Sequence, residues 1–365
     1  MACRTFGRVL RSKEYGIIAI PCPQTLAQRS FSSSASLFKH GAIPTFTTTS
    51  SPKLDEILSD IRKTIFLPSH LSKDHQKLIY SQQGKDRLED DPVYVDINGE
   101  RFQLDHIDRT RDVPNHAATL FEAINLMEKR KDFDNIAVIL EGYQDTGYVL
   151  NEERKLGLMR HLSQKGRLDV ILELARRGKD TAFHFTEQRV LEKWVFELQL
   201  HAANSNWDKK HTQQALSWLE MTADMLQDST HKVPSTSKLY SVLLQLAAVR
   251  ATRHLGGTDD GGKVADYAEK LYATSWDTAL PANARPEDEK NMRLKSLVTI
   301  LHGSKLAVEV LDPASTITKQ LQDKIPGLEA EVANLKESLK QATQVTEKAW
   351  GGIQLYNRSF GPNAL

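Results

Sequence analysis

The sequence has little cysteine, no long apolar run and almost no net charge. Its only two cysteines are Cys3 and Cys22, so residues 23–365 can form no disulfide, thiolate metal site or cysteine nucleophile. No stretch reaches about 18 consecutive apolar residues, which argues against a helix that spans a bilayer. The net charge of +1 gives no overall basicity of the kind that indicates nucleic acid. Hydrophobic residues make up 40% of the chain, enough for a sizeable core and too many for a wholly disordered protein.

Acidic residues are almost absent from the first 40 residues, where Glu14 is the only one. The six basic side chains there give this segment a net charge of +5, and six serines lie among them. This composition is typical of a mitochondrial presequence, because the inside-negative inner membrane pulls a cationic helix inward. We therefore expect residues 1–38 to be a presequence, with the mature chain starting near Ser32 or Lys39. The alternative is a merely disordered basic tail.

The rest of the chain divides into five expected regions. Apolar residues at helical spacing predict a helix over 53–65, and Ser72 is a suitable N-cap for a short helix over 73–81. The regions are a polar linker at 39–52, a small α+β region at 53–113 with a hairpin at 93–104, a helical domain with weak repeats at 114–311, a long C-terminal helical region at 312–350 and an extended tail at 351–365. The expected fold class is mostly α, with a small N-terminal α+β part.

The clearest local signal is Asn98-Gly99, which lies between two runs of alternating apolar residues. Asn-Gly favours a two-residue type I′ loop, because both residues readily adopt a positive φ. The register then contains three pairs: Ile97 with Glu100, Val95 with Phe102, and Val93 with Leu104. An isolated hairpin is only marginally stable in water, so its apolar face must be covered by a helix or by a partner.

Helical periodicity continues from Pro114 almost to the end of the chain. The expected helices span 115–130, 134–144, 151–164, 168–178, 186–204, 209–227, 236–254, 262–275, 286–311 and 326–348. The first six form pairs, and the turn within each pair places an apolar residue directly before an aspartate: Phe133, Leu168 and Trp207. Their spacing of 35 and 39 residues is typical of a helical-hairpin solenoid. An irregular helical bundle would explain the same helices.

Apolar residues at alternating spacings of four and three form a heptad pattern between Leu321 and Ala342, interrupted by Pro326. Such a pattern indicates either coiled-coil pairing with a partner or a long helix that packs on its own domain. The tail at 351–365 lacks periodicity, and we expect it to be extended and to lie on a partner.

No catalytic motif stands out. Residues 257–263 match a Walker phosphate loop, but Val264 replaces the Ser or Thr that binds magnesium, and Asp259 and Asp260 would repel phosphates. Neither H-E-x-x-H nor G-x-S-x-G occurs. We therefore expect no enzyme activity, no catalytic residues, no metal site and no cofactor.

Basic residues in the turns are the candidate binding residues, because stacked helix pairs would line them up along one edge and cations there could bind phosphates. The candidate RNA contacts are Lys129, Arg130, Lys131, Lys165, Arg167, Arg176, Arg177 and Lys179. The competing interpretation is that lysine and arginine simply favour solvent and helix C-termini.

Three stretches of the sequence resemble mitochondrion-specific ribosomal proteins of filamentous fungi. They are residues 66–80, which contain Phe-Leu-Pro-Ser-His-Leu-Ser and Leu-Ile-Tyr, residues 92–104, and residues 156–177. The greatest similarity is to the large-subunit protein numbered fifty. Together the stretches cover less than a third of the chain.

The resemblance implies a structural constituent of the mitochondrial ribosome, in its large subunit, located in the matrix. Its expected partners are ribosomal RNA and neighbouring ribosomal proteins, with no small-molecule substrate, no membrane span and no free homo-oligomer. The net charge of −4 for residues 41–365 indicates a peripheral position with mainly protein contacts. Two alternatives stay open, a helical-repeat RNA-binding or translation factor of the matrix and an assembly factor of a respiratory complex.

Overall fold

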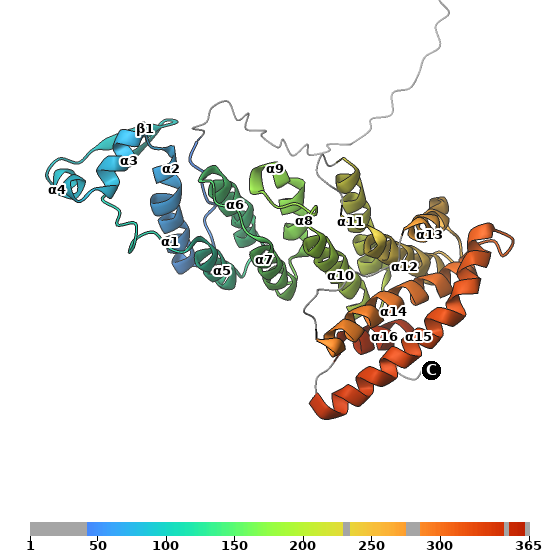
Figure 1. Cartoon of the computed structure of the whole chain (residues 1–365). Coiled ribbons are helices and arrows are strands. Elements are labelled where there is room, and N and C mark those ends of the chain that lie inside the picture. Colours follow the sequence, from blue (N-terminus) through green and yellow to red (C-terminus); the bar gives the residue numbers. More distant parts are fainter. Residues whose placement is uncertain (1–41, 229–233, 275–284, 347–349, 362–365) are drawn as a thin grey trace, which may run out of the picture. The chain divides into compact units, whose positions relative to one another are not determined.

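The computed structural model describes residues 42–228, 234–274, 285–346 and 350–361 (Figure 1). The expected presequence at 1–38 lies outside these residues. The described chain is mostly helical with one two-stranded sheet, which confirms the predicted fold class. Among the described residues, no helix is both long and apolar enough to cross a membrane. The boundaries predicted between the five regions stay predictions.

The N-terminal part contains short helices and the hairpin. Its helical elements are α1 (Pro52–Ile61), the π-helical turn η1 (Arg62–Phe66), α2 (Leu67–His70), α3 (Lys73–Tyr80) and α4 (Gln82–Asp90). The apolar face of α1 is buried through Leu54, Leu58 and Ile61. As expected, the hydroxyl of Ser72 caps α3 by accepting a hydrogen bond from the His75 N–H.

The hairpin has the predicted turn and register. Strands β1 (Tyr94–Ile97) and β2 (Glu100–Gln103) are antiparallel, and Asn98 and Gly99 both have a positive φ. The cross-strand pairs are Ile97–Glu100 and Val95–Phe102, and the Leu104 N–H donates to the Val93 carbonyl at 2.9 Å. The alternate apolar side chains pack against the main hydrophobic core, so the chain itself covers this face.

Ten longer helices follow, and they correspond one to one to the ten predicted ones. They are α5 (His116–Leu126), α6 (Asn135–Asp145), α7 (Glu152–Gln164), α8 (Leu168–Arg176), α10 (Gln188–Asn204), α11 (Lys209–Gln227), α12 (Ser237–His254), α13 (Lys263–Ala273), α14 (Pro286–Val310) and α15 (Thr316–Thr346). Three short elements, η2 (Arg130–Asp134), α9 (Gly178–Thr181) and η3 (Asp260–Gly262), lie in the connections.

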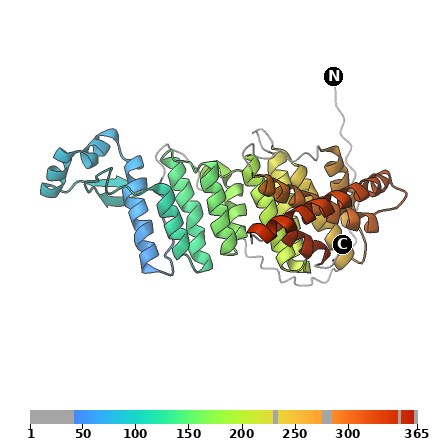
Figure 2. The ribbon, with the colours of Figure 1, turned by 60° about the horizontal axis from the view of Figure 1, so that its bottom comes forward.

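The first helix of each pair packs on the first helix of the next pair. Contacts join α1 to α5, α5 to α7, α7 to α10, α10 to α12 and α12 to α14 (Figures 1 and 2). Helices α5, α7 and α10 begin at His116, Glu152 and Gln188, 36 residues apart each time. This arrangement favours the solenoid-like interpretation over an irregular bundle. It also places the C-terminal ends of α5, α7, α10 and α12 at one edge of the row.

The heptad residues of α15 lie against the protein itself. Leu321, Leu328, Val332 and Leu339 are buried in the isolated chain, and α15 packs along α14. The helix begins at Thr316 and runs through Pro326, so it starts ten residues earlier than the predicted helix.

The prediction of an extended tail at 351–365 is wrong for most of its length, because residues 351–360 form helix α16 (Gly351–Phe360). Leu355 and Tyr356 are fully buried, and α16 packs on α14 and α10. Two glycines begin this helix, which weakens its intrinsic propensity. Burial against α14 supplies the stability that propensity lacks.

Candidate nucleic-acid interface

The first turn of the candidate edge is organised by a buried carboxylate. Asp132 accepts hydrogen bonds from the N–H and hydroxyl of Ser50 at 2.9 and 2.7 Å, and from the N–H groups of Lys129 and Glu128 at 2.8 and 3.1 Å. Burial acts to raise the pKa of Asp132, but these donors outweigh it and hold the pKa below its ordinary value. The turn is thereby fixed, with the side chains of Lys129, Arg130 and Lys131 exposed.

Lys165 and Arg167 use their charges to join the first two turns. The Lys165 ammonium donates to the carbonyls of Asn125 and Met127, both at 3.1 Å, and so caps the C-terminus of α5. Arg167 forms a two-pronged pair with Asp169 and donates to the Arg130 carbonyl at 2.9 Å.

The Arg167 guanidinium also lies over the Phe133 ring, 4.6 Å from its centroid. Two of the eight predicted RNA contacts therefore hold successive helix pairs together.

The third turn, at 205–208, is held in a similar way by side chains from the next pair. Its residues Asn206 and Trp207 both have a positive φ. The Asn206 carbonyl accepts from Arg253 at 3.4 Å, and the Trp207 carbonyl lies 3.0 Å from Nε2 of His254. The contacts of Arg253 and His254 could not be predicted from the sequence, because each residue meets this turn across a separation of 47 residues.

Beside the third turn lies a groove of about 800 Å³ between α11 and α12. Lys209 and Lys210 line it together with Arg250 and His254. Arg250 is paired with Asp260 at 2.8 Å. Among the described residues, no ion pair involves Lys209 or Lys210, nor Lys129 or Lys131 of the first turn. These four exposed lysines are called the turn edge below.

The last three candidates, Arg176, Arg177 and Lys179, do not lie in the three turns. Helix α8 starts at the second turn, so Arg176, at the end of its nine residues, lies roughly 13 Å away along the helix axis. Arg176 pairs with Glu173 at 3.7 Å, and Arg177 forms an ion pair with Glu141. Lys179 is exposed in α9. The structure therefore separates the eight predicted residues into a group of five and a group of three.

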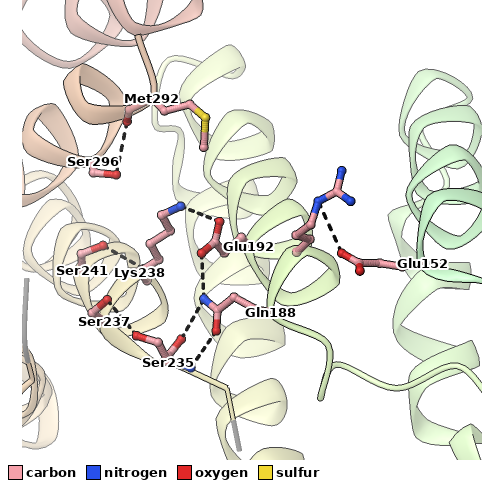
Figure 3. A network of polar contacts seen from close by, with 10 residues as sticks. Glu152, Gln188, Glu192, Ser235, Ser237, Lys238, Ser241, Met292 and Ser296 are labelled. Carbon is pink, nitrogen blue, oxygen red and sulfur yellow. Dashed lines mark hydrogen bonds and ion pairs between the residues drawn. The ribbon is translucent and has the colours of Figure 1, made fainter. Parts of the chain in front are cut away.

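At the end of the helices opposite the turn edge, polar side chains form a network between the first helices of three pairs (Figure 3). Glu192 of α10 pairs with Lys238 of α12 at 2.5 Å, and the Gln188 side-chain carbonyl accepts from the Ser235 N–H at 2.7 Å. Arg189 reaches Glu152 of α7 at 3.4 Å. The charges of Glu192, Lys238, Arg189 and Glu152 thus link neighbouring helices.

The Walker-like segment is not arranged to bind phosphate. The carboxylate of Asp259 accepts from the N–H groups of Val264 and Ala265 at 2.9 and 3.2 Å, so it occupies the N-terminus of α13 itself. Lys263 pairs with Glu220 at 2.6 Å. Within the described part of the chain, no group of three or more His, Cys, Asp or Glu side chains is placed to hold a metal ion.

Comparison with known proteins gives a consistent match to one family. The family model for mitochondrial ribosomal protein mS27 matches residues 29–358. The small ribosomal subunit protein mS27 of Neurospora crassa is 27% identical over 272 residues, which cover 67% of this chain and 69% of the relative.

These matches overturn the predicted resemblance to the large-subunit protein numbered fifty, because both name a small-subunit protein. The stretches that suggested that resemblance contain residues of the hydrophobic core. Leu71, Ile79 and Leu104 are buried core residues, and such residues report a fold rather than the subunit in which a protein is found.

Proposed function

We propose that this chain, which belongs to the mitochondrial ribosomal protein mS27 family, is a structural component of the small subunit of the mitochondrial ribosome. In the matrix it would support translation by docking on ribosomal RNA and neighbouring ribosomal proteins, without catalysis. The observation that carries this proposal is the family match, which extends over residues 29–358 and so includes nearly all of the described chain.

The structure supports a docking role in two ways. The row of first helices is tied together by buried contacts and by cations that cap neighbouring turns, which gives a preformed surface. The turn edge adds four exposed lysines that no carboxylate of the described residues neutralises. We propose that the turn edge, together with Arg130, contacts RNA phosphates, whereas Lys165 and Arg167 hold the turns in place.

Sedimentation tests the proposal directly. A tagged copy of the full chain is produced in mitochondria, and a lysate is fractionated on gradients that separate the two ribosomal subunits. We expect the protein to migrate with the small subunit and to remain there at high salt.

Three other outcomes would contradict the proposal. Migration with the large subunit would refute the subunit assignment. Loose, salt-sensitive association with RNA would indicate a free RNA-binding factor, and migration with membrane complexes would indicate a respiratory assembly factor.

A further inference from the structure

An open groove of about 1,090 Å³ lies outside the helix pairs, between α3, α4 and the loop at 104–113. Its lining contains four basic side chains, Lys73, Lys77, Arg87 and Arg109, and a single carboxylate, Asp74. None of the eight residues predicted as RNA contacts belongs to it. We call it the α3–α4 groove.

The walls of this groove are fixed by short-range contacts. Helix α4 approaches α3 so closely that a Cβ atom on Gly84 would lie 1.9 Å from the Leu78 carbonyl oxygen. The Ile107 N–H donates to the Ile79 carbonyl at 2.9 Å, which attaches the loop to the end of α3. Asp108 then forms a turn by accepting from the Thr110 N–H at 2.8 Å. Arg109 is therefore presented from a structured turn.

Within the described part of the chain, the four cations of the α3–α4 groove have no acidic partner at ion-pair distance. Several arginines of the described chain form ion pairs with carboxylates, whereas no ion pair among the described residues involves Lys73, Lys77, Arg87 or Arg109. The lining also includes Gln83 and Gly84 in the first turn of α4, where the helix dipole adds partial positive charge. Cations from three separate elements thus converge on one open groove.

We infer that the α3–α4 groove binds the phosphate backbone of a single-stranded RNA segment. The four unpaired cations favour binding of a polyanion. When they neutralise phosphates, they displace the counterions condensed on the nucleic acid, and the release of these counterions favours binding. RNA is favoured over an acidic peptide by Arg109, whose guanidinium carbon lies over the Tyr80 ring, 4.0 Å from its centroid. The outer face of that guanidinium can stack on a base, whereas the carboxylate of an acidic peptide cannot stack on it.

This inference deepens the proposed function, since it names a site through which ribosomal RNA would be held. Its test uses the purified full chain and a fluorescein-labelled oligouridylate of 15 nucleotides. Binding is measured by fluorescence anisotropy over a range of salt concentrations. The variant is Lys73→Gln/Lys77→Gln/Arg87→Gln, in which three exposed side chains of the groove lose their charge while Arg109 stays on Tyr80.

The matched control is Lys53→Gln/Lys63→Gln/Lys319→Gln, which removes three exposed lysines that lie elsewhere and line no part of the groove. We expect the groove variant to bind more weakly and its plot of log K against log salt to be shallower by about 2, since each phosphate contact on a single strand contributes roughly 0.7 to the slope. The control should retain the wild-type slope. Far-ultraviolet circular dichroism checks that both variants are folded.

Two results would overturn the inference. One is a groove variant whose affinity and salt slope equal those of the control. The other is a 15-residue polyglutamate peptide that displaces the oligouridylate at a lower concentration than unlabelled oligouridylate does, which would assign the groove to an acidic protein segment. Sedimentation separates this inference from the proposed function. If the wild-type chain migrates with the small subunit while the groove variant binds RNA unchanged, only the groove assignment fails.

Discussion

Arg167 is a basic residue whose guanidinium is already paired with groups of the protein itself. Only 13% of its side chain is exposed, and its guanidinium contacts Asp169, the Arg130 carbonyl and the Phe133 ring. Lys131 lies in the neighbouring turn with its side chain exposed. In the sequence, both residues are cations within two positions of a turn aspartate. They differ in their partners, because removing Arg167 leaves Asp169 and a carbonyl without a donor, whereas Lys131 is exposed to solvent.

We expect Arg167→Ala to lower the free energy of unfolding by about 2–3 kcal/mol, because it removes charge-assisted hydrogen bonds and leaves Asp169 and a carbonyl without their donor. Lys131→Ala should change it by less than about 0.5 kcal/mol, since its side chain is solvated. Urea unfolding of both variants, followed by circular dichroism, measures the difference. Equal stability of the two variants would show that Arg167 is not a structural clamp.

The candidate site could be predicted from sequence only in part, and the reason lies at this scale. The positions of basic residues within turns are visible in the sequence. Whether a particular cation is free depends on carbonyls 37 to 40 residues away, as for Arg167 and Lys165. The cations of the α3–α4 groove were missed for the same reason, because only the fold brings Arg109 beside α3.

At the scale of elements, local signals were sufficient where local physics decides the structure. Asn98-Gly99 determines the hairpin turn through φ, and helical periodicity located ten helices. The tail was mispredicted because α16 depends on a distant partner. Trp207, for example, donates from its indole N–H to the Arg358 carbonyl at 3.0 Å, across 151 residues.

A buried polar network joins three of the first helices. Gln199 of α10 donates to the Gln245 side-chain oxygen at 2.6 Å and to Thr299 of α14 at 2.7 Å. The side-chain nitrogen of Gln245 lies 2.8 Å from Nδ1 of His302. Burial, with the nearby charges of Arg253 and Lys305, lowers the pKa of His302 to about 3. His302 is therefore neutral and accepts the hydrogen bond from Gln245.

This network predicts a pH-dependent stability. The unfolded chain protonates His302 near pH 6.5 and the folded chain only near pH 3. Burying the neutral imidazole therefore costs no protonation energy above about pH 6.5. As the pH falls below this value, the free energy of unfolding decreases, because the unfolded chain binds the proton first. Between pH 7.5 and pH 5 the wild-type chain should lose about 2 kcal/mol relative to His302→Gln, which cannot titrate. Urea unfolding at both pH values gives the difference. If the gap between the two proteins is the same at both pH values, His302 is not held neutral by the fold.

The whole molecule separates its charge between two parts. Residues 1–40 carry +5, and the remaining residues carry −4. In the described part of the chain, some cations pair with carboxylates of neighbouring elements, and others lie at the turn edge or in the α3–α4 groove. A protein with a net negative charge can thus still offer local clusters of cations to RNA phosphates.

The charge of the first part gives the last prediction, which concerns import into the matrix. If residues 1–38 act as a presequence, Arg4→Gln/Arg8→Gln/Arg11→Gln should strongly reduce uptake by isolated mitochondria, because the membrane potential contributes about 2.3 kcal/mol per positive charge per 100 mV. The matched control is Lys53→Gln/Lys63→Gln/Lys319→Gln, which removes the same charge from the larger part. Uptake is measured as protease-protected radiolabelled protein, with dissipation of the potential as the baseline. Equal uptake of the two variants, or a matrix protein that retains Met1, would refute the presequence.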